Sequence, residues 1–407
     1  MNDLRVDVEN YTEQIVTLLW PDAAVDAEGG AAGMLALPSV RRARLLVPAR
    51  QRKVASSAVQ RYSVHGDAKA RLSSAALSIG LRSGLLQPLI RRRSWLPGGT
   101  AEQGSITAHL RTIVSLDCEV AVYVGLPRGN RKPVLLVLEP NGTLSAVAKL
   151  GVTALSGRLI RNESEALTTL NAAPLKHVTV PQVLFAGEWA GAPLLVQSAL
   201  PEIGPAPGDT ARRREAAAVE ISRINGVETH RVATSPVLDE LEQRVAALPE
   251  GSERDLAGRT LYRLRDAGDV EFPVGSWHGD WTPWNHAAAS TGGMLVWDWE
   301  RFSAGVPLGY DALHFSGQVG AGLHGGPQGA LAVTRSELNA LLDPFGVAAE
   351  ARQTVFALYL LEILVRYTED GQARMAIGRS WVDALAGCLE GFLADLARPS
   401  SQQRKAS

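Results

Sequence analysis

The polar residues with the most informative spacing lie between positions 276 and 300. Asp280 is followed five positions later by Asn285, and Asp298 comes after a short apolar stretch. Carboxylate and amide oxygens are hard ligands of the kind that Mg²⁺ prefers. A carboxylate within hydrogen-bond reach of a hydroxyl group can orient that group and accept its proton. Asp280, Asn285 and Asp298 supply these functions in the order that phosphoryl transfer from a nucleotide requires.

The full constellation is His278-Gly279-Asp280, four residues, Asn285, and then Asp298-Trp299-Glu300. It resembles that of the aminoglycoside phosphotransferase/choline kinase superfamily, and the resemblance covers roughly residues 112 to 395. The resemblance implies a protein-kinase-like fold with two lobes, Asp280 as the catalytic base, and Asn285 and Asp298 as metal ligands. It also implies ATP and Mg²⁺ as cofactors and a hydroxyl group of a small molecule as the acceptor.

The tripeptide alone carries little information, because His65-Gly66-Asp67 repeats it. Five positions past Asp67 stands Leu72, and no Asp-Trp-Glu follows at short range. We therefore interpret the first copy as an ordinary turn.

Phosphoryl transfer also needs a cation for the nucleotide phosphates and a glutamate that holds this cation in place. The chain has only six lysines against 35 arginines, and one of them, Lys149, stands near the end of an expected strand. We predict that Lys149 binds the phosphates. Its partner is Glu163 or Glu165, since helical geometry alone does not decide between residues two apart. The family pattern favours Glu163.

Two further segments are candidates for nucleotide binding. Gly125 and Gly129 lie in a turn whose backbone amides could cradle phosphate, although a solvated hairpin tip is almost as good an interpretation. Ser198 and Leu200 occupy the place of the hinge between the lobes. The resemblance implies that the hinge backbone binds adenine.

Other residues around Asp280 are expected to support the loop. His278 should brace it by hydrogen bonding. Asp311 follows a segment that resembles the family's Gly-x-Pro-x-x-Asp, with one extra residue, and the resemblance implies a bracing role for it as well. Five tryptophans cluster in this part of the chain: Trp277, Trp281, Trp284, Trp297 and Trp299. We expect them to pack the loop, with stacking of a sugar or aromatic acceptor as the alternative.

The elements that position these residues follow from turn signals and hydrophobic spacing. A helix is expected at 159–170, after a connecting loop at 151–157, and Glu139-Pro140-Asn141-Gly142 predicts a hairpin turn. Strands are expected at 120–124, 133–138, 143–150, 183–186 and 193–198. After residue 201 the pattern is mostly helical, apart from a loop and strand between 276 and 300. A strand-rich part followed by a helical part predicts an α+β architecture.

A chain of 407 residues is too long for one compact core. Its 46% hydrophobic and 20% charged residues are typical of a globular protein. We predict four parts by position: a basic N-terminal region of uncertain fold (1–100), a nucleotide-binding lobe (101–200), a helical catalytic lobe (201–399) and a disordered tail (400–407).

The N-terminal region is strongly basic although the whole chain has a net charge of −1. Residues 41–95 contain 13 basic residues and one acid, Asp67. Such a region either packs against the rest of the chain or binds an external polyanion, whose binding would fall with salt. We favour packing, because the region also offers apolar residues to bury, such as Leu45, Leu46 and Val47. A strand at 45–48 and helices at 54–62 and 70–79 are expected within it.

No targeting or membrane segment is expected. Cys118 and Cys388 match no metal-ligand or redox spacing, which favours a reducing compartment. The N-terminus lacks the features of a signal peptide. The longest apolar stretch, 355–365, has eleven residues and includes Glu362, so it predicts a buried helix and no membrane span. A cytoplasmic location is the expectation.

These observations favour an ATP- and Mg²⁺-dependent phosphotransferase that acts on a hydroxyl group of a sugar, an amino alcohol or an aminoglycoside-like compound. The alternative is a nucleotide-binding pseudokinase that works as a scaffold through its basic N-terminal region. A pseudokinase usually lacks one of the polar groups that phosphoryl transfer needs. All of them are present in this sequence, which argues against this alternative. Between residues 335 and 398 nine acids stand against six arginines, too small an excess to predict a site for a polycation.

Overall fold

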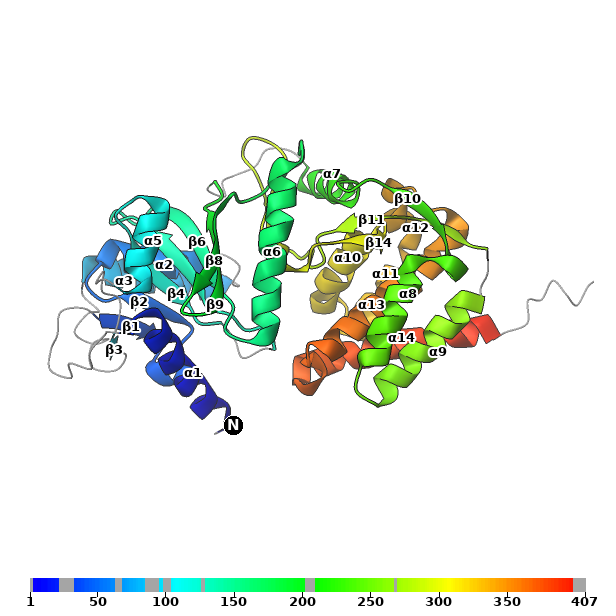
Figure 1. The fold of residues 1–407 in the computed structure, drawn as a ribbon, viewed down its shortest axis with the longest axis horizontal. Coiled ribbons are helices and arrows are strands. Elements are labelled where there is room, and N and C mark those ends of the chain that lie inside the picture. Colours follow the sequence, from blue (N-terminus) through cyan, green and yellow to red (C-terminus); the bar gives the residue numbers. More distant parts are fainter. Residues whose placement is uncertain are drawn as a thin grey trace, which may run out of the picture. The chain divides into compact units, whose positions relative to one another are not determined.

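The computed structural model describes residues 3–21, 33–62, 68–84, 95–97, 104–125, 129–201, 209–266 and 269–397. The turn expected at 65–67 and the tail at 400–407 lie outside these residues. The chain forms two compact units, the first from Met1–Thr168 with Pro181–Leu200 and the second from Thr169–Val180 with Pro201–Ser407. The expected order of a strand-rich part and then a helical part is confirmed (Figure 1).

One antiparallel sheet of eight strands forms the centre of the first unit, in the order β3-β1-β2-β4-β5-β6-β9-β8. Its strands are β1 (Gly33–Leu37), β2 (Leu45–Pro48), β3 (Trp95–Pro97), β4 (Glu119–Tyr123), β5 (Val134–Leu138), β6 (Leu144–Leu150), β8 (Val183–Trp189) and β9 (Ala192–Ser198). Leu46 of β2 pairs with Val122 of β4. The N-terminal strands therefore continue the sheet that carries Lys149.

The described residues of the first unit form the helices α1 (Asp3–Leu19), α2 (Arg52–Tyr62), α3 (Ala68–Ser83), α5 (Ile106–Val114) and most of α6 (Ala154–Ala172). Side chains alternate between the two faces of a strand. Val120 and Val122 of β4 accordingly pack with α1 and α5 in one core cluster. Ala121, between them, packs with α2 and α3 in a second cluster. The sheet is thus covered by helices on both faces, and the N-terminal region supplies most of this cover.

The elements expected in the first unit are present, with one correction. The loop predicted at 151–157 is wrong, because α6 begins at Ala154. Thr153 and Ser156 explain the earlier start, since the amide of each donates to the hydroxyl oxygen of the other, at 2.9 and 3.1 Å. This reciprocal pair satisfies amide groups that the first turn of a helix leaves without a partner.

The second unit has more strands than its mostly helical sequence pattern suggests. Two sheets of three strands form, β10-β11-β14 and β12-β13-β7. Their strands are β7 (Val178–Thr179), β10 (Glu228–Arg231), β11 (Glu271–Trp277), β12 (His286–Ala288), β13 (Met294–Val296) and β14 (Ser303–Pro307). These strands are short and local spacing does not reveal them. They frame the loops that carry Asp280 and Asp298.

The helices of the second unit are α7 (Thr210–Ser222), α8 (Pro236–Ala247), α9 (Ser252–Asp266), α10 (Tyr310–Leu323), α11 (Pro327–Ser336), α12 (Leu338–Leu342), α13 (Arg352–Glu369) and α14 (Ala376–Ala397). Helix α13 contains the apolar stretch 355–365 and is buried along almost its whole length, as expected. Among the described helices, none has the length and apolarity needed to cross a membrane.

Candidate functional site

The loop between β11 and β12 carries Asp280 and is fixed by its backbone. Gly279 has a φ of +83°, and a Cβ atom there would lie 2.1 Å from the carbonyl oxygen of Arg301, so only glycine fits. Asp311 of α10 accepts hydrogen bonds from the amides of His278 and Gly279, at 2.7 and 3.2 Å. Arg366 of α13 donates to the carbonyl oxygen of Gly279 at 2.5 Å. Helix α10 thus holds this turn through its amide groups, and helix α13 holds it through a carbonyl group.

The carboxylate of Asp280 is held in place and is still accessible. Its Oδ2 accepts a hydrogen bond from the Asn285 side-chain amide at 2.8 Å. Its Oδ1 lies 3.3 Å from Nε2 of His314. The side chain is 35% exposed. Because each carboxylate oxygen has two lone pairs, Asp280 can still accept a hydrogen bond from a further hydroxyl group.

The register of β12 and β13 brings Asn285 and Asp298 together. His286 is paired with Val296 across the two strands. Just beyond this pair, the amide of Trp297 donates to the carbonyl oxygen of Asn285 at 3.0 Å. Asp298 follows with a φ of +68°, a left-handed conformation that is uncommon outside glycine. Since the Asn285 amide nitrogen contacts Asp280, the amide oxygen is the atom that remains for a cation.

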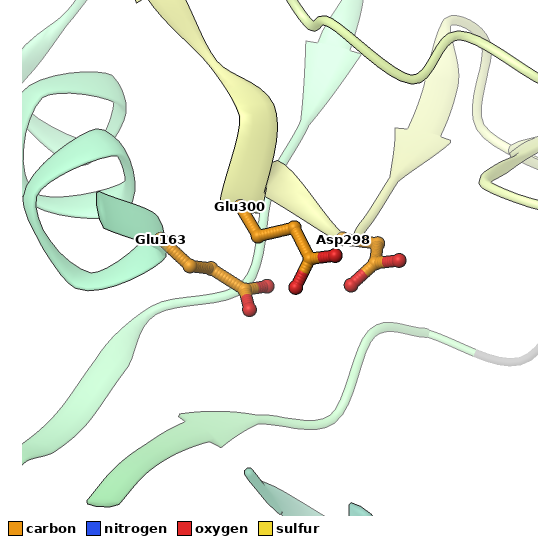
Figure 2. Close-up of side chains that lie close together, drawn as sticks. All are labelled: Glu163, Asp298 and Glu300. Atoms are coloured by element: carbon orange, nitrogen blue, oxygen red, sulfur yellow. The ribbon is translucent and has the colours of Figure 1, made fainter. Parts of the chain in front are cut away.

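A second carboxylate accompanies Asp298. One carboxylate oxygen of Asp298 lies within 4.8 Å of one of Glu300, and Figure 2 shows the two carboxylates next to each other. Glu300 is 4% exposed, whereas Asp298 is partly exposed. The donor set of Asn285, Asp298 and Glu300 consists only of oxygens, which fits Mg²⁺. The sequence interpretation did not include Glu300 among the metal ligands, although the Asp-x-Glu spacing could have indicated it.

Burial and neighbouring donors set the pKa values around the loop. Burial works to raise the pKa of Asp280, but the hydrogen bond from His314 and the charge of Arg366 outweigh it, so the pKa lies below its ordinary value of 3.8. Burial lowers the pKa of His278 to about 4. Burial also raises the pKa of Asp311 to about 7, against the two amide donors. Asp280 is therefore ionised and His278 is neutral at neutral pH.

His278 lies inside the loop and uses both ring nitrogens. Its Nδ1 accepts from the amide of Asp280 at 3.2 Å, and its Nε2 lies 3.1 Å from the carbonyl oxygen of Trp297. The side chain is fully buried. The ring therefore connects the loop that carries Asp280 to the segment that carries Asp298.

In the first unit, Lys149 of β6 forms a buried ion pair with Glu163 of α6. The Lys149 ammonium group lies 2.6 and 2.8 Å from the two carboxylate oxygens of Glu163. The two side chains are 7% and 0% exposed, and Figure 2 shows Glu163 projecting from its helix. Glu165 is exposed. Of the two candidate glutamates, Glu163 is the one in contact with Lys149.

The turn between β4 and β5 is tied to the N-terminal region. Gly125 has a φ of +77°, and its carbonyl oxygen accepts a hydrogen bond from Arg44 at 3.2 Å. Arg131 donates to the carbonyl oxygen of Val124 at 3.1 Å, and its guanidinium carbon lies 3.6 Å from the ring centroid of Tyr11 in α1. Residues 126–128 lie outside the described chain, and Gly129 forms part of the turn.

The first residues of the expected hinge have backbone amides that already donate hydrogen bonds. The amide of Ser198 donates to the carbonyl oxygen of Gln182 at 2.8 Å, and its hydroxyl accepts from the Gln182 amide at 3.0 Å. The next amide, that of Ala199, donates to Ser145 at 3.2 Å. Within the described part of the chain, the backbone of Leu200 makes no such bond. Of these three hinge residues, Leu200 is the one whose backbone amide donates no hydrogen bond to a described residue.

Most of the clustered tryptophans pack the site. Trp277, Trp281 and Trp299 are at most 3% exposed, and the indole nitrogens of Trp277 and Trp299 donate to Ser303 and Val296. Trp284 differs, because 46% of it is exposed on the loop between Asp280 and Asn285.

Sequence reasoning did not identify His314 and Arg366. Both act on the loop from helices that follow it by tens of residues. For His314 a signal existed, since it follows Asp311 by three residues and so lies on the same helix face.

Comparison with known proteins gives structural likeness without sequence matches. No model of a known protein family matches the chain, and no curated protein sequence matches it. Several solved structures are similar at low identity. An aminoglycoside 2″-phosphotransferase with GDP and kanamycin has a TM-score of 0.40 and 16% identity, covering 67% of this chain and 91% of its own.

Two more phosphotransferase structures are similar in the same way. One, in a ternary complex with ADP and hygromycin B, has a TM-score of 0.46 and 10% identity, covering 74% of this chain and 100% of its own. The other, a spectinomycin phosphotransferase with ADP and spectinomycin, has a TM-score of 0.40 and 10% identity, covering 72% and 94%. At these values neither a substrate nor the role of a residue is carried over to this chain.

Proposed function

We propose that this protein is an ATP- and Mg²⁺-dependent phosphotransferase that transfers the γ-phosphoryl group to a hydroxyl group of a small molecule. The observation that carries the proposal is the Asp280 carboxylate, which is held through both oxygens and is still accessible, next to Asn285 and Asp298. A carboxylate in this state can orient an acceptor hydroxyl group and take its proton.

Each unit supplies one part of the proposed chemistry. In the first unit, Lys149 would bind the nucleotide phosphates, with Glu163 holding its ammonium group, and Gly125, Gly129 and Leu200 would contact the nucleotide through their backbones. In the second unit, Asn285 and Asp298 would hold Mg²⁺, with Glu300 beside them. The ion supplies charge neutralisation for the phosphoryl group when it is bound.

The acids between residues 335 and 398 favour a neutral acceptor with several hydroxyl groups over a polycation. Of the nine acids between residues 335 and 398, seven form ion pairs with arginines: Asp343, Glu362, Glu369, Asp370, Asp383, Glu390 and Asp395. Only Glu337 and Glu350 have no ion pair with a described residue. Acids that are already neutralised leave little charge for an aminoglycoside. The exposed indole of Trp284 offers a face on which a sugar ring can stack.

The experiment that tests the function is an acceptor screen with purified protein, ATP or GTP, and Mg²⁺. Sugars, polyols, amino alcohols and aminoglycosides are compared by nucleotide consumption and by the mass of the product. We expect phosphorylation of a neutral sugar or polyol, with little turnover of aminoglycosides. Nucleotide binding without turnover of any compound in the screen would favour the pseudokinase alternative.

Replacing Asp298 or Asn285 by Ala should weaken the apparent affinity for Mg²⁺ in phosphotransfer. The Asp298 substitution should have the larger effect. Asp298 offers a charged oxygen ligand, whereas Asn285 offers a neutral carbonyl oxygen. The measurement is a Mg²⁺ titration of phosphotransfer at fixed ATP. Asp269→Ala is the matched control, because this side chain is 97% exposed. An unchanged apparent Mg²⁺ affinity in Asp298→Ala would contradict the assignment.

A further inference from the structure

His314 of α10 is a buried imidazole that touches the carboxylate of Asp280. Its Nε2 lies 3.3 Å from Oδ1 of Asp280, and its Nδ1 lies 3.2 Å from the hydroxyl oxygen of Tyr359 in α13. The His314 side chain is 1% exposed, and Tyr359 is 2% exposed. The contact with Tyr359 is therefore buried, and the contact with Asp280 is partly buried.

The chemistry of the three groups fixes the direction of both hydrogen bonds. An ionised carboxylate can only accept hydrogen bonds, so Nε2 of His314 must carry the proton that faces Asp280. Burial lowers the pKa of His314, so the ring is neutral at neutral pH and its Nδ1 has a lone pair. The Tyr359 hydroxyl must then donate to Nδ1. Tyr359 thus selects the ring tautomer that can bind Asp280.

Two donors are needed to orient this carboxylate. The final torsion of an Asp side chain is broad and has no strong intrinsic preference, so the backbone contacts of the loop do not fix the carboxylate plane. Asn285 holds Oδ2 at 2.8 Å and His314 holds Oδ1 at 3.3 Å. With one donor on each oxygen, rotation of the carboxylate breaks at least one hydrogen bond.

We propose that His314 is a positioning residue that, together with Tyr359, orients the Asp280 carboxylate toward the acceptor hydroxyl group. This inference rests on the proposed function, because it assigns the orientation of the group that receives the acceptor. Two residues on one face of α10 would then support the loop. Asp311 holds its backbone, and His314 holds the side chain of Asp280.

Two substitutions at His314 separate positioning from packing. The side-chain amide of Gln can reach the position of Nε2 and donate to Asp280, whereas that of Asn reaches only the position of Nδ1. We expect His314→Asn to lower kcat by about 10- to 100-fold with little change in the KM for ATP, and His314→Gln to recover most of this loss. Tyr359→Phe removes one hydroxyl group and should lower kcat by only a few-fold.

A structural role would not produce this order. If His314 only fills space, Gln and Asn should reduce kcat alike, in step with their effects on the melting temperature. Equal kcat values for the Gln and Asn variants, or kcat within about twofold of the wild type for Asn, would overturn the proposal.

Nitrogen-15 NMR of the imidazole rings gives a readout that does not require turnover. The signal of His314 is assigned from its loss in His314→Gln. We expect a neutral ring with the proton on Nε2, and a shift of that nitrogen in Asp280→Asn. An unchanged His314 signal in Asp280→Asn would overturn the contact. An inactive wild-type protein with the expected NMR result would instead contradict the proposed function alone.

Discussion

Replacing Asp280 by Asn should abolish phosphoryl transfer and leave ATP binding almost unchanged. The substitution keeps the size of the side chain but removes the charge that orients and deprotonates the acceptor hydroxyl group. Positioned general bases typically contribute 10²–10⁴-fold to a rate, so we expect a loss of this order in kcat. Lys149 and Glu163, which we assign to the nucleotide, lie in the other unit and keep their ion pair. Initial rates and calorimetric titration with a non-hydrolysable ATP analogue measure the two effects separately.

The chain contains its own matched control for this substitution. His65-Gly66-Asp67 repeats the tripeptide of the proposed site without the Asn and Asp that follow it. Asp67→Asn should therefore leave both turnover and ATP binding at wild-type levels. If Asp280→Asn retained more than about a tenth of the wild-type turnover, Asp280 would not be the acceptor-binding carboxylate.

The sequence predicts well those parts of the fold whose signals are local. The hairpin of β5 and β6 has its turn signal at 139–142, and α13 has an uninterrupted apolar stretch. The pairing of β2 with β4 could not be predicted, because Leu46 and Val122 are 76 residues apart. The local sequence of each strand does not indicate which strand it pairs with. The short strands β10 and β14 are stabilised by pairing with β11 more than by their own composition.

The same distinction holds for the site. The order Asp280, Asn285, Asp298 was visible because all three residues belong to one continuous segment. Helical geometry could not decide between Glu163 and Glu165, because the choice depends on which side of α6 faces Lys149, and only the family pattern favoured Glu163. Arg366 reaches the loop through tertiary packing that the periodicity of its own helix could not reveal, whereas the three-residue spacing from Asp311 could have indicated His314.

A chain that begins at Thr100 should fail to fold into a stable, soluble protein. Residues before 100 supply ten of the thirteen buried residues of the core cluster on the α2–α3 face of the sheet, and eight of the twenty-one on the α1–α5 face. Burial of one Leu, Val or Ile side chain contributes about 1.5–3 kcal/mol, and a domain has a net stability of only about 5–15 kcal/mol. Truncation removes several such side chains and turns β4 into an exposed edge strand, which promotes aggregation.

Specific polar contacts would be lost in addition to the apolar ones. The indole of Trp20 donates to Thr107 at 3.0 Å, and that of Trp189 donates to the carbonyl oxygen of Leu18 at 2.8 Å. Without Arg44 and Tyr11, the turn at Gly125 would also lose its contacts with the N-terminal region. Soluble yield, circular dichroism and thermal unfolding of the truncated chain measure these effects.

Fragment complementation separates a structural role from an independent module. Co-expression of residues 1–99 with residues 100–407 should restore solubility and ATP binding, because the missing strands can pair again with β4. A truncated chain that stays folded and active by itself would show that the N-terminal region is an independent module, in which case its 13 cations would point to an external polyanion. Salt-sensitive binding of heparin to residues 1–99, absent from the full chain, would instead show that packing covers these cations.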